Sequence, residues 1–186
     1  MRGRQSLLML TLALLRHAKS SWDDPGIDDF ARPLADRGRI AAPLMGEYLV
    51  RHRLQPDLII CSAALRTRAT LDLVLPFFGP VPPAIAYEES LYLASASDLL
   101  SRLRSVASRW PSVMLIGHNP GFHDLAVALA ATGDPQALAT LSVKFPTAAL
   151  AILTLQTSNW ANVRPGLGHL THFVTPSSLQ KGRASA

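Results

Sequence analysis

The 186-residue chain contains a single cysteine, Cys61, so it cannot form an internal disulfide framework. One cysteine suits a reducing compartment, and we therefore expect a cytoplasmic protein. The basic residues are scattered and form no run interleaved with aromatics, although the formal net charge is +5. This balance favours anionic partners, such as phosphorylated molecules, and argues against a nucleic-acid partner.

The chain also lacks an apolar run of the roughly 20 residues that a membrane-spanning helix needs, so we expect no membrane partner. Its first residues, MRGRQSLLMLTLALL, have the basic start and apolar centre of a secretory signal. However, no small-x-small cleavage site precedes the charged residues, and cleavage after Ala18 would remove Arg16 and His17. We expect a buried first strand here, keep export as the alternative, and leave open whether translation starts at Met1 or Met9.

Nucleotide-binding and metal-binding patterns are missing as well. No Walker loop occurs, and no glycine-rich dinucleotide motif follows the first apolar run. His118 and His123 are five residues apart, which does not place them on one face of a helix. His169 and His172 on a strand would point to opposite faces. We therefore expect neither a cofactor nor a metal ion.

Apolar runs alternate with amphipathic stretches, which predicts an α/β fold with a largely parallel sheet. Strands are predicted at LTLALLRH, PDLIICS, PAIAYEE, SVMLIGHNPG, TAALAILTL and LGHLTHFVTP. Helices are predicted at residues 36–54 and 122–131, at ALRTRATLDLVLPFF, and at ASDLLSRLRSVASRW with Ser97 as its N-cap. We predict one domain over residues 9–176, a three-layer sandwich whose mostly parallel central sheet is flanked by helices. Residues 177–186 are predicted to be a flexible tail.

Polar side chains follow three of the predicted strands at their carboxyl ends. They are Arg16 and His17, Ser62 with Arg66 beyond it, and Gly117, His118 and Asn119. Ligands bind at this edge of open parallel sheets, so we expect these side chains to meet in one pocket. Two guanidinium groups match phosphate oxygens, and two imidazoles supply a neutral nucleophile and a hydrogen-bonding group. The pattern predicts a site for a phosphoryl group.

Short segments of the chain also occur in an order and spacing that a known family shares. They are LLRHAKSSW, RPLADRG, PDLIICSAALRTRAT, Leu91-Tyr92, GHNPG and FPTAAL, and they extend from about Leu12 to Pro176. The chain thereby resembles the histidine phosphatase superfamily, and within it the SixA-type phosphohistidine phosphatases. The superfamily's Arg-His-Gly motif appears here as Arg16-His17-Ala18. This resemblance implies a phosphoglycerate mutase-like fold and a metal-independent phosphatase with a covalent phosphohistidine intermediate.

The resemblance also implies roles for individual residues. His17 would be the nucleophile that becomes phosphorylated, and Arg16, Arg66 and His118 would form the phosphate pocket with it. Gly117 would permit close backbone approach. Supporting positions at the pocket are implied for Asn119, which would steady the loop, and for Ser20 and Lys19, which would border the entrance.

The general acid stays open at this point. Larger members of the superfamily use a carboxylate, and Glu88 and Glu89 lie in a loosely equivalent segment; solvated turn residues are the alternative. SixA-type proteins often lack such an acid. An alkoxide leaving group needs a positioned acid, whereas an imidazole nitrogen can be protonated before the phosphorus–nitrogen bond breaks.

Phosphohistidine in a protein is therefore the preferred substrate. A small phosphomonoester is the enzymatic alternative, and a phosphoprotein-binding module without turnover is the non-enzymatic one. A mutase is disfavoured because a clear acid and long substrate loops are missing. The chain departs from the branch at Ala148, where glycine is usual.

Overall fold

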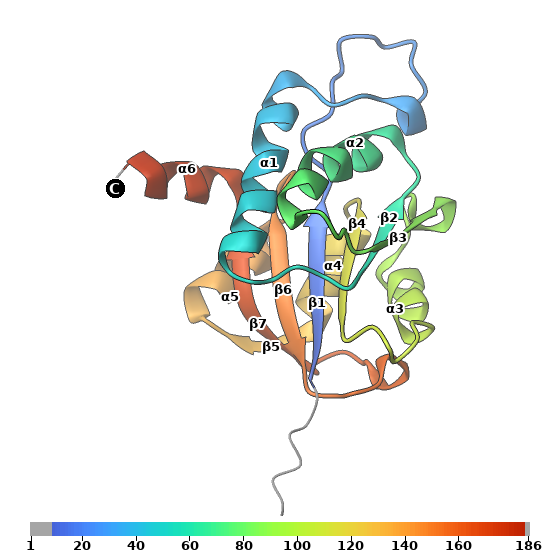
Figure 1. The fold of residues 1–186 in the computed structure, drawn as a ribbon, viewed down its shortest axis with the longest axis vertical. Helices are drawn as coiled ribbons and strands as arrows, with labels where there is room; N and C mark the ends of the chain where they lie inside the picture. Colours follow the sequence, from blue (N-terminus) through green and yellow to red (C-terminus); the bar gives the residue numbers. More distant parts are fainter. Residues whose placement is uncertain (1–8, 185–186) are drawn as a thin grey trace, which may run out of the picture.

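The computed structural model describes residues 9–184, in which seven strands form one sheet (Figure 1). The strands are β1 (Leu10–Arg16), β2 (Leu58–Ser62), β3 (Ala84–Glu88), β4 (Ser112–Gly117), β5 (Ala130–Gly133), β6 (Leu150–Leu155) and β7 (Gly168–Val174). Their order across the sheet is β3-β2-β4-β1-β6-β7-β5. The strands β1, β2, β3 and β4 run parallel, as do β5 and β7, and β6 alone is antiparallel to its neighbours in the described chain. The prediction of a mostly parallel sheet is confirmed.

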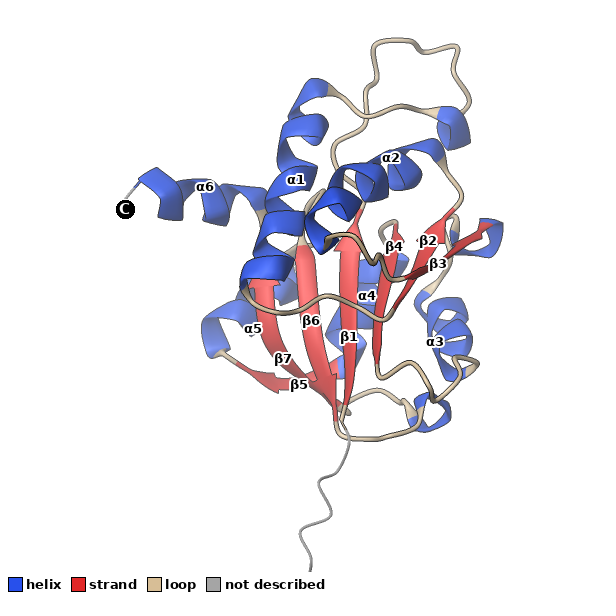
Figure 2. Cartoon of the chain, in the orientation of Figure 1, coloured by secondary structure: helices blue, strands red, loops and turns tan. Residues whose placement is uncertain are grey.

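Helices cover both faces of the sheet, which confirms the three-layer arrangement (Figure 2). On one face lie α1 (Asp36–Arg51), α2 (Leu65–Val74) and α6 (Pro176–Ala184); on the other lie α3 (Ala96–Arg104), α4 (Gly121–Leu129) and α5 (Pro135–Val143). Short 3-10 helices, η1 (Asp29–Ala31), η2 (Leu75–Phe78), η3 (Glu89–Leu91) and η4 (Trp160–Asn162), lie in the connections.

The position of β1 in the middle of the sheet explains why its sequence is continuously apolar instead of alternating between apolar and polar residues. Leu12 and Leu14 pack into the core beneath α3, α4 and α5, whereas Ala13 and Leu15 pack into the core beneath α1 and α2. All four side chains are buried, and a buried leucine contributes roughly 1.5–3 kcal/mol to folding. A strand covered on both faces has no solvent side for polar residues. Its first charged and titratable side chains therefore come where the strand ends, at Arg16 and His17.

The segment after α4 differs from its prediction. The helix expected over residues 122–131 ends at Leu129, and Ala130–Gly133 form the edge strand β5, followed by the unpredicted helix α5. The run AATG carries no strand-like apolar pattern, so only its pairing with β7 makes it a strand. The start of α5 had a sequence signal, because Asp134 caps the helix and Pro135 is its first residue.

The N-cap of α3 is Ser95, so the assignment to Ser97 was wrong. The Ser95 hydroxyl accepts a hydrogen bond from the Asp98 amide, and the Asp98 carboxylate accepts one from the Ser95 amide. This reciprocal pair satisfies two amides at the helix start, an arrangement that Ser97 cannot make from inside the first turn.

The two ends of the chain bear on two earlier predictions. The segment expected to be a tail is helical up to Ala184, in α6, and its flexibility stays a prediction. The question of a signal peptide or a start at Met9 concerns residues 1–8, which lie outside the described residues. Across residues 9–184, no helix has both the length and the apolar character to cross a membrane.

Candidate active site

The carboxyl ends of β1 and β4 and the start of α2 meet at one pocket of about 450 Å³. Arg16 pairs with Gly117 in the parallel register of β1 and β4, so the residues that follow, His17 and His118, leave the sheet side by side. The ring centroids of these two histidines lie 5.2 Å apart. The structure thus brings together most of the residues singled out from the sequence: Arg16, His17, Lys19, Ser20, Arg66, His118 and Asn119.

The imidazole of His17 is held in one tautomer by the backbone of the next residue, Ala18. Nδ1 lies 2.7 Å from the Ala18 carbonyl oxygen, and because a carbonyl only accepts, Nδ1 must carry the proton. The side chain is 7% exposed, and burial lowers its pKa to about 4, opposed by the Ala18 hydrogen bond. The ring is therefore neutral at pH 7, with an unprotonated Nε2. This is the form of imidazole that can act as a nucleophile.

The second imidazole, His118, is 2% exposed and stands against the first. Its Nε2 is 2.9 Å from the Ser62 hydroxyl at the end of β2, and its Nδ1 is a buried atom without a hydrogen-bond partner in the described structure. Burial, then the neighbouring His17 and Arg66, lowers its pKa to about 3. The ring is thus a neutral group that Ser62 orients.

Arg16 is tied to the loop between α5 and β6. Its Nη1 donates to the Phe145 carbonyl at 2.9 Å, and Asn119 Nδ2 donates to the same oxygen at 2.9 Å. Arg16 Nε and Asn119 Oδ1 are buried without a hydrogen-bond partner among the described residues. Burial and the nearby Arg66 charge lower the pKa of Arg16. Unsatisfied buried donors are costly, so this Nε is a donor available to an anion.

Arg66 lies in the first turn of α2 and is 4% exposed. Its guanidinium binds Asp29, with Nη1 donating to the backbone carbonyl and Nη2 to the carboxylate at 2.9 Å. Tyr92 also donates to that carboxylate, at 2.6 Å. The hydrogen bond from Tyr92, followed by the Arg66 charge, lowers the pKa of Asp29 against the effect of burial. Asp29 is therefore ionised, and it orients Arg66.

The residues of this region that were not singled out from the sequence as site residues include Trp22, Asp29, Arg32 and Tyr92. The Arg32 guanidinium carbon lies 3.3 Å from the centroid of the Trp22 ring, and both residues line the pocket with Asp29. Several aspartates occur in the loop between β1 and α1, and no spacing distinguishes Asp29 from the others. Trp22, Arg32 and Tyr92 do occur in segments of the resemblance, namely LLRHAKSSW, RPLADRG and Leu91-Tyr92, which was the signal available for them.

Two groups of predicted residues lie away from the pocket lining. Glu88 forms an ion pair with Arg102, with a shortest distance of 2.7 Å, and Glu89 begins η3 without lining the pocket. A Cβ on Gly117 would come within 2.4 Å of the Phe122 ring, so glycine is required at this position to let α4 pack against the end of β4.

Cys61 is fully buried, and burial raises the pKa of its thiol to about 12, as expected for a core residue.

The pocket carries the donors that an anion needs. Cationic side chains contribute from several elements, and Asp29 is the one carboxylate among the residues that line it. In the described part of the chain, no group of three or more His, Cys, Asp or Glu could hold a metal ion. The arrangement can bind a phosphoryl group beside a neutral imidazole nitrogen.

The lowered pKa values predict how the two histidines titrate. Because burial disfavours the charged form, both should stay neutral from about pH 8 to about pH 5, whereas a free histidine is half protonated near 6.5. Imidazole nitrogen shifts from NMR should report His17 as the Nδ1-protonated tautomer throughout. A midpoint near 6.5 for His17, or a proton on Nε2, would contradict this geometry.

Comparisons with known proteins agree with the fold. No family model matches the chain, but an uncharacterized protein of Mycobacterium tuberculosis strain H37Rv is 37% identical over 164 residues, 87% of this chain and 99% of that protein. A solved candidate phosphohistidine phosphatase SixA from Agrobacterium tumefaciens is 32% identical with a TM-score of 0.75, over 90% of this chain and 98% of that one. Another, from Nakamurella multipartitia, is 26% identical with a TM-score of 0.77, over 90% and 96%. The chain belongs to the histidine phosphatase superfamily, in its SixA branch.

Proposed function

We propose that this protein is a metal-independent phosphatase that removes phosphate from phosphohistidine in another protein, with His17 as the covalent nucleophile. The observation that carries the proposal is the hydrogen bond from His17 Nδ1 to the Ala18 carbonyl. It leaves Nε2 unprotonated inside a pocket that Arg16, Arg66 and His118 also line. Phosphatase activity also accords with the SixA branch to which the chain belongs.

Arg16 and Arg66 are the groups that would bind the phosphoryl oxygens. A hydrogen bond to a charged partner contributes roughly 1.5–3 kcal/mol, and guanidinium groups fit phosphate in pairs of bonds. Arg66 stands in the first turn of the ten-residue helix α2, whose dipole adds positive potential at the same place. Neutralising the phosphoryl charge in this way lets the uncharged His17 approach phosphorus without repulsion.

The reaction has two steps. In the first, the Nε2 lone pair forms a bond to phosphorus while the substrate's phosphorus–nitrogen bond breaks, and the departing imidazole nitrogen takes up a proton. The His17 ring is then positively charged, and the Ala18 carbonyl stabilises that charge through Nδ1–H. In the second step water attacks phosphorus, the bond to Nε2 breaks, and inorganic phosphate and one proton leave. His118 and the arginines would stabilise the equatorial oxygens in both steps.

The choice of phosphohistidine as substrate depends on the carboxylates near the pocket. Asp29 lines it, but its pKa is lowered and its oxygen accepts from both Arg66 and Tyr92, so it is a poor proton donor. Glu88 is paired with Arg102. A leaving group that can be protonated by solvent is better suited to this site than an alkoxide, which needs a positioned acid.

The rim of the pocket also suits a protein substrate. Trp22 is 68% exposed and Leu93 is 52% exposed, and both line the opening. Exposed apolar side chains at a site are typical of surfaces that bind another macromolecule. The cytoplasm is the compartment we propose, because the single cysteine suits a reducing environment. A small phosphomonoester remains the alternative substrate, and a binding module without turnover the non-enzymatic alternative.

Turnover separates these functions. Wild-type protein incubated with a phosphohistidine peptide should release many equivalents of phosphate per chain, and a phosphomonoester should be hydrolysed more slowly. His17→Ala should lose at least about a thousandfold in rate, because the substitution removes the nitrogen that forms the bond to phosphorus. His169→Ala, which removes an exposed histidine of β7, is the matched control. Release of no more than one equivalent by the wild type would mean a binding module.

The proposed role of Arg66 in phosphate binding can be tested by measuring the affinity for inorganic phosphate. Arg66→Ala should weaken the binding of inorganic phosphate about 10- to 100-fold, the loss expected for a charge-assisted hydrogen bond. The unfolding midpoint should stay within about 4 °C of wild type, since the Asp29 side chain is 43% exposed and water can replace the lost partner. Calorimetric titration measures the affinity, and Arg68→Ala, an exposed cation on the same helix, is the control. Unchanged affinity would place Arg66 outside the phosphate site.

A further inference from the structure

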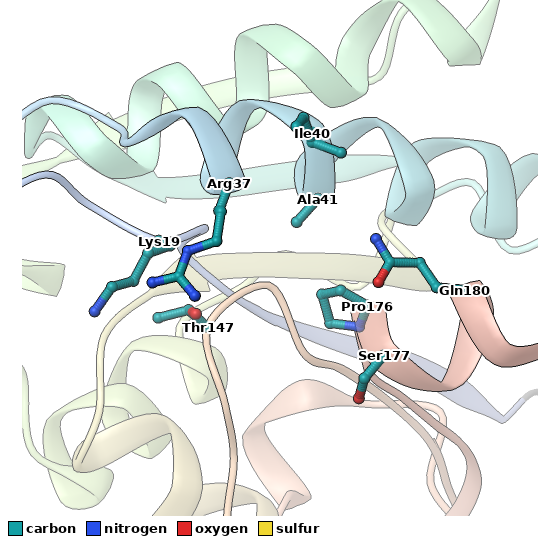
Figure 3. Close-up of a pocket in the computed structure, with 8 residues that line it drawn as sticks. All are labelled: Lys19, Arg37, Ile40, Ala41, Thr147, Pro176, Ser177 and Gln180. Carbon is teal, nitrogen blue, oxygen red and sulfur yellow. The ribbon is translucent and has the colours of Figure 1, made fainter.

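A second groove, of about 490 Å³, adjoins the active-site pocket (Figure 3). Lys19 and Thr147 line both, so the two depressions share a boundary. Arg37, Ile40 and Ala41 of α1 form one wall, and Pro176, Ser177 and Gln180 of α6 form the other. Figure 3 shows the Lys19 and Arg37 side chains extending to the same end of the groove, next to Thr147. The proposed reaction does not use this groove.

The charged side chains that line the groove are all positive. None of its lining residues is acidic, and neither Lys19 nor Arg37 forms an ion pair in the described structure. Most other cations near this end have an acidic partner: Arg32 and Arg66 share Asp29, and Arg39 faces Asp36. Two unpaired cations at the boundary of a phosphate site favour an anionic group on the part of the substrate beside the phosphoryl group.

The two cations are held close by the backbone. A Cβ on Gly38 would lie 2.2 Å from the Lys19 carbonyl oxygen, so only glycine lets the first turn of α1 pack this tightly on the chain after β1. The same Lys19 oxygen accepts a hydrogen bond from the Ala35 amide at 2.9 Å. Lys19, two residues after His17, and Arg37, the residue before Gly38, are thereby fixed on neighbouring stretches of backbone. Their proximity is a property of the fold.

The rest of the groove indicates a polypeptide as its occupant. Ile40 is 63% exposed, and with Ala41 and Pro176 it supplies an apolar surface next to the cations. Gln180 offers an amide that can both donate and accept, which suits a peptide backbone. A free phosphate or a small anion would use the cations and leave this apolar surface without a partner.

We propose that this groove binds an acidic segment that flanks the phosphorylated histidine in the substrate protein. The proposal rests on the proposed function and specifies its substrate class: a phosphohistidine protein with aspartate or glutamate close to the modified residue. Lys19 and Arg37 contact the carboxylates, and Ile40 with Pro176 covers the apolar side of the segment.

The test compares two phosphohistidine peptides that differ only in two flanking aspartates, replaced by asparagines in the second. Wild type should prefer the acidic peptide in kcat/KM by about fivefold to tenfold at low salt, and the preference should shrink toward high salt. Arg37→Glu should abolish or reverse the preference; glutamate is favourable at a helix N-terminus, so α1 is retained. Arg39→Glu, the same charge change two residues along the helix, should keep it.

A binding measurement separates the two proposals. The same peptides are made with a phosphonate triazole in place of phosphohistidine, which the enzyme cannot hydrolyse, and their affinities are measured by fluorescence anisotropy. Tighter binding of the acidic analogue, lost in Arg37→Glu and kept in Arg39→Glu, supports the groove whether or not the phosphohistidine peptides turn over. Equal affinity for both analogues, or a preference that survives Arg37→Glu, overturns it. Absence of turnover with the groove preference intact overturns only the proposed reaction.

Discussion

The hydrogen bond between His17 Nδ1 and the Ala18 carbonyl is the contact on which the proposed chemistry depends. It fixes both the tautomer and the orientation of the His17 ring. Three further hydrogen bonds hold the backbone of His17 and Ala18 in place. The His17 amide donates to the Gly117 carbonyl, the His17 carbonyl accepts from the Ala148 amide, and the Ala18 amide donates to the Thr70 hydroxyl. Strand, loop and helix thus converge on one imidazole.

Burial is the second constraint, and it acts on every charge in the pocket. A buried imidazole is driven to its neutral form, whereas the guanidinium groups keep their charge and need compensation. Asp29 gives that compensation to Arg66, and Tyr92 keeps Asp29 ionised and in place. Arg16 instead relies on the Phe145 carbonyl. The pocket is thereby positive overall around an uncharged nucleophile, the arrangement that a phosphoryl group needs.

Sequence reasoning succeeded where one local pattern decides the structure. Apolar strands that end in Arg16-His17 and Gly117-His118 predicted both the sheet and the meeting of these residues. It failed where tertiary contacts decide: β5 is a strand only through β7, and Asp29 reaches Arg66 only because its loop folds back. The glycine reasoning was incomplete, since Gly117 makes room for Phe122. Ala148 has φ 57°, in the left-handed region that glycine enters freely, which gives a physical reason for the branch's usual glycine there.

The nitrogen that carries the phosphoryl group tests the central claim most directly. Wild-type protein is mixed with excess phosphohistidine peptide and quenched in alkaline denaturant, in which phosphohistidine persists. Phosphorus NMR and peptide mapping then locate the label. Because Nδ1 is committed to the Ala18 carbonyl, the phosphoryl group should be found on Nε2 of His17. Phosphorylation at Nδ1, or on any other residue, would contradict the account.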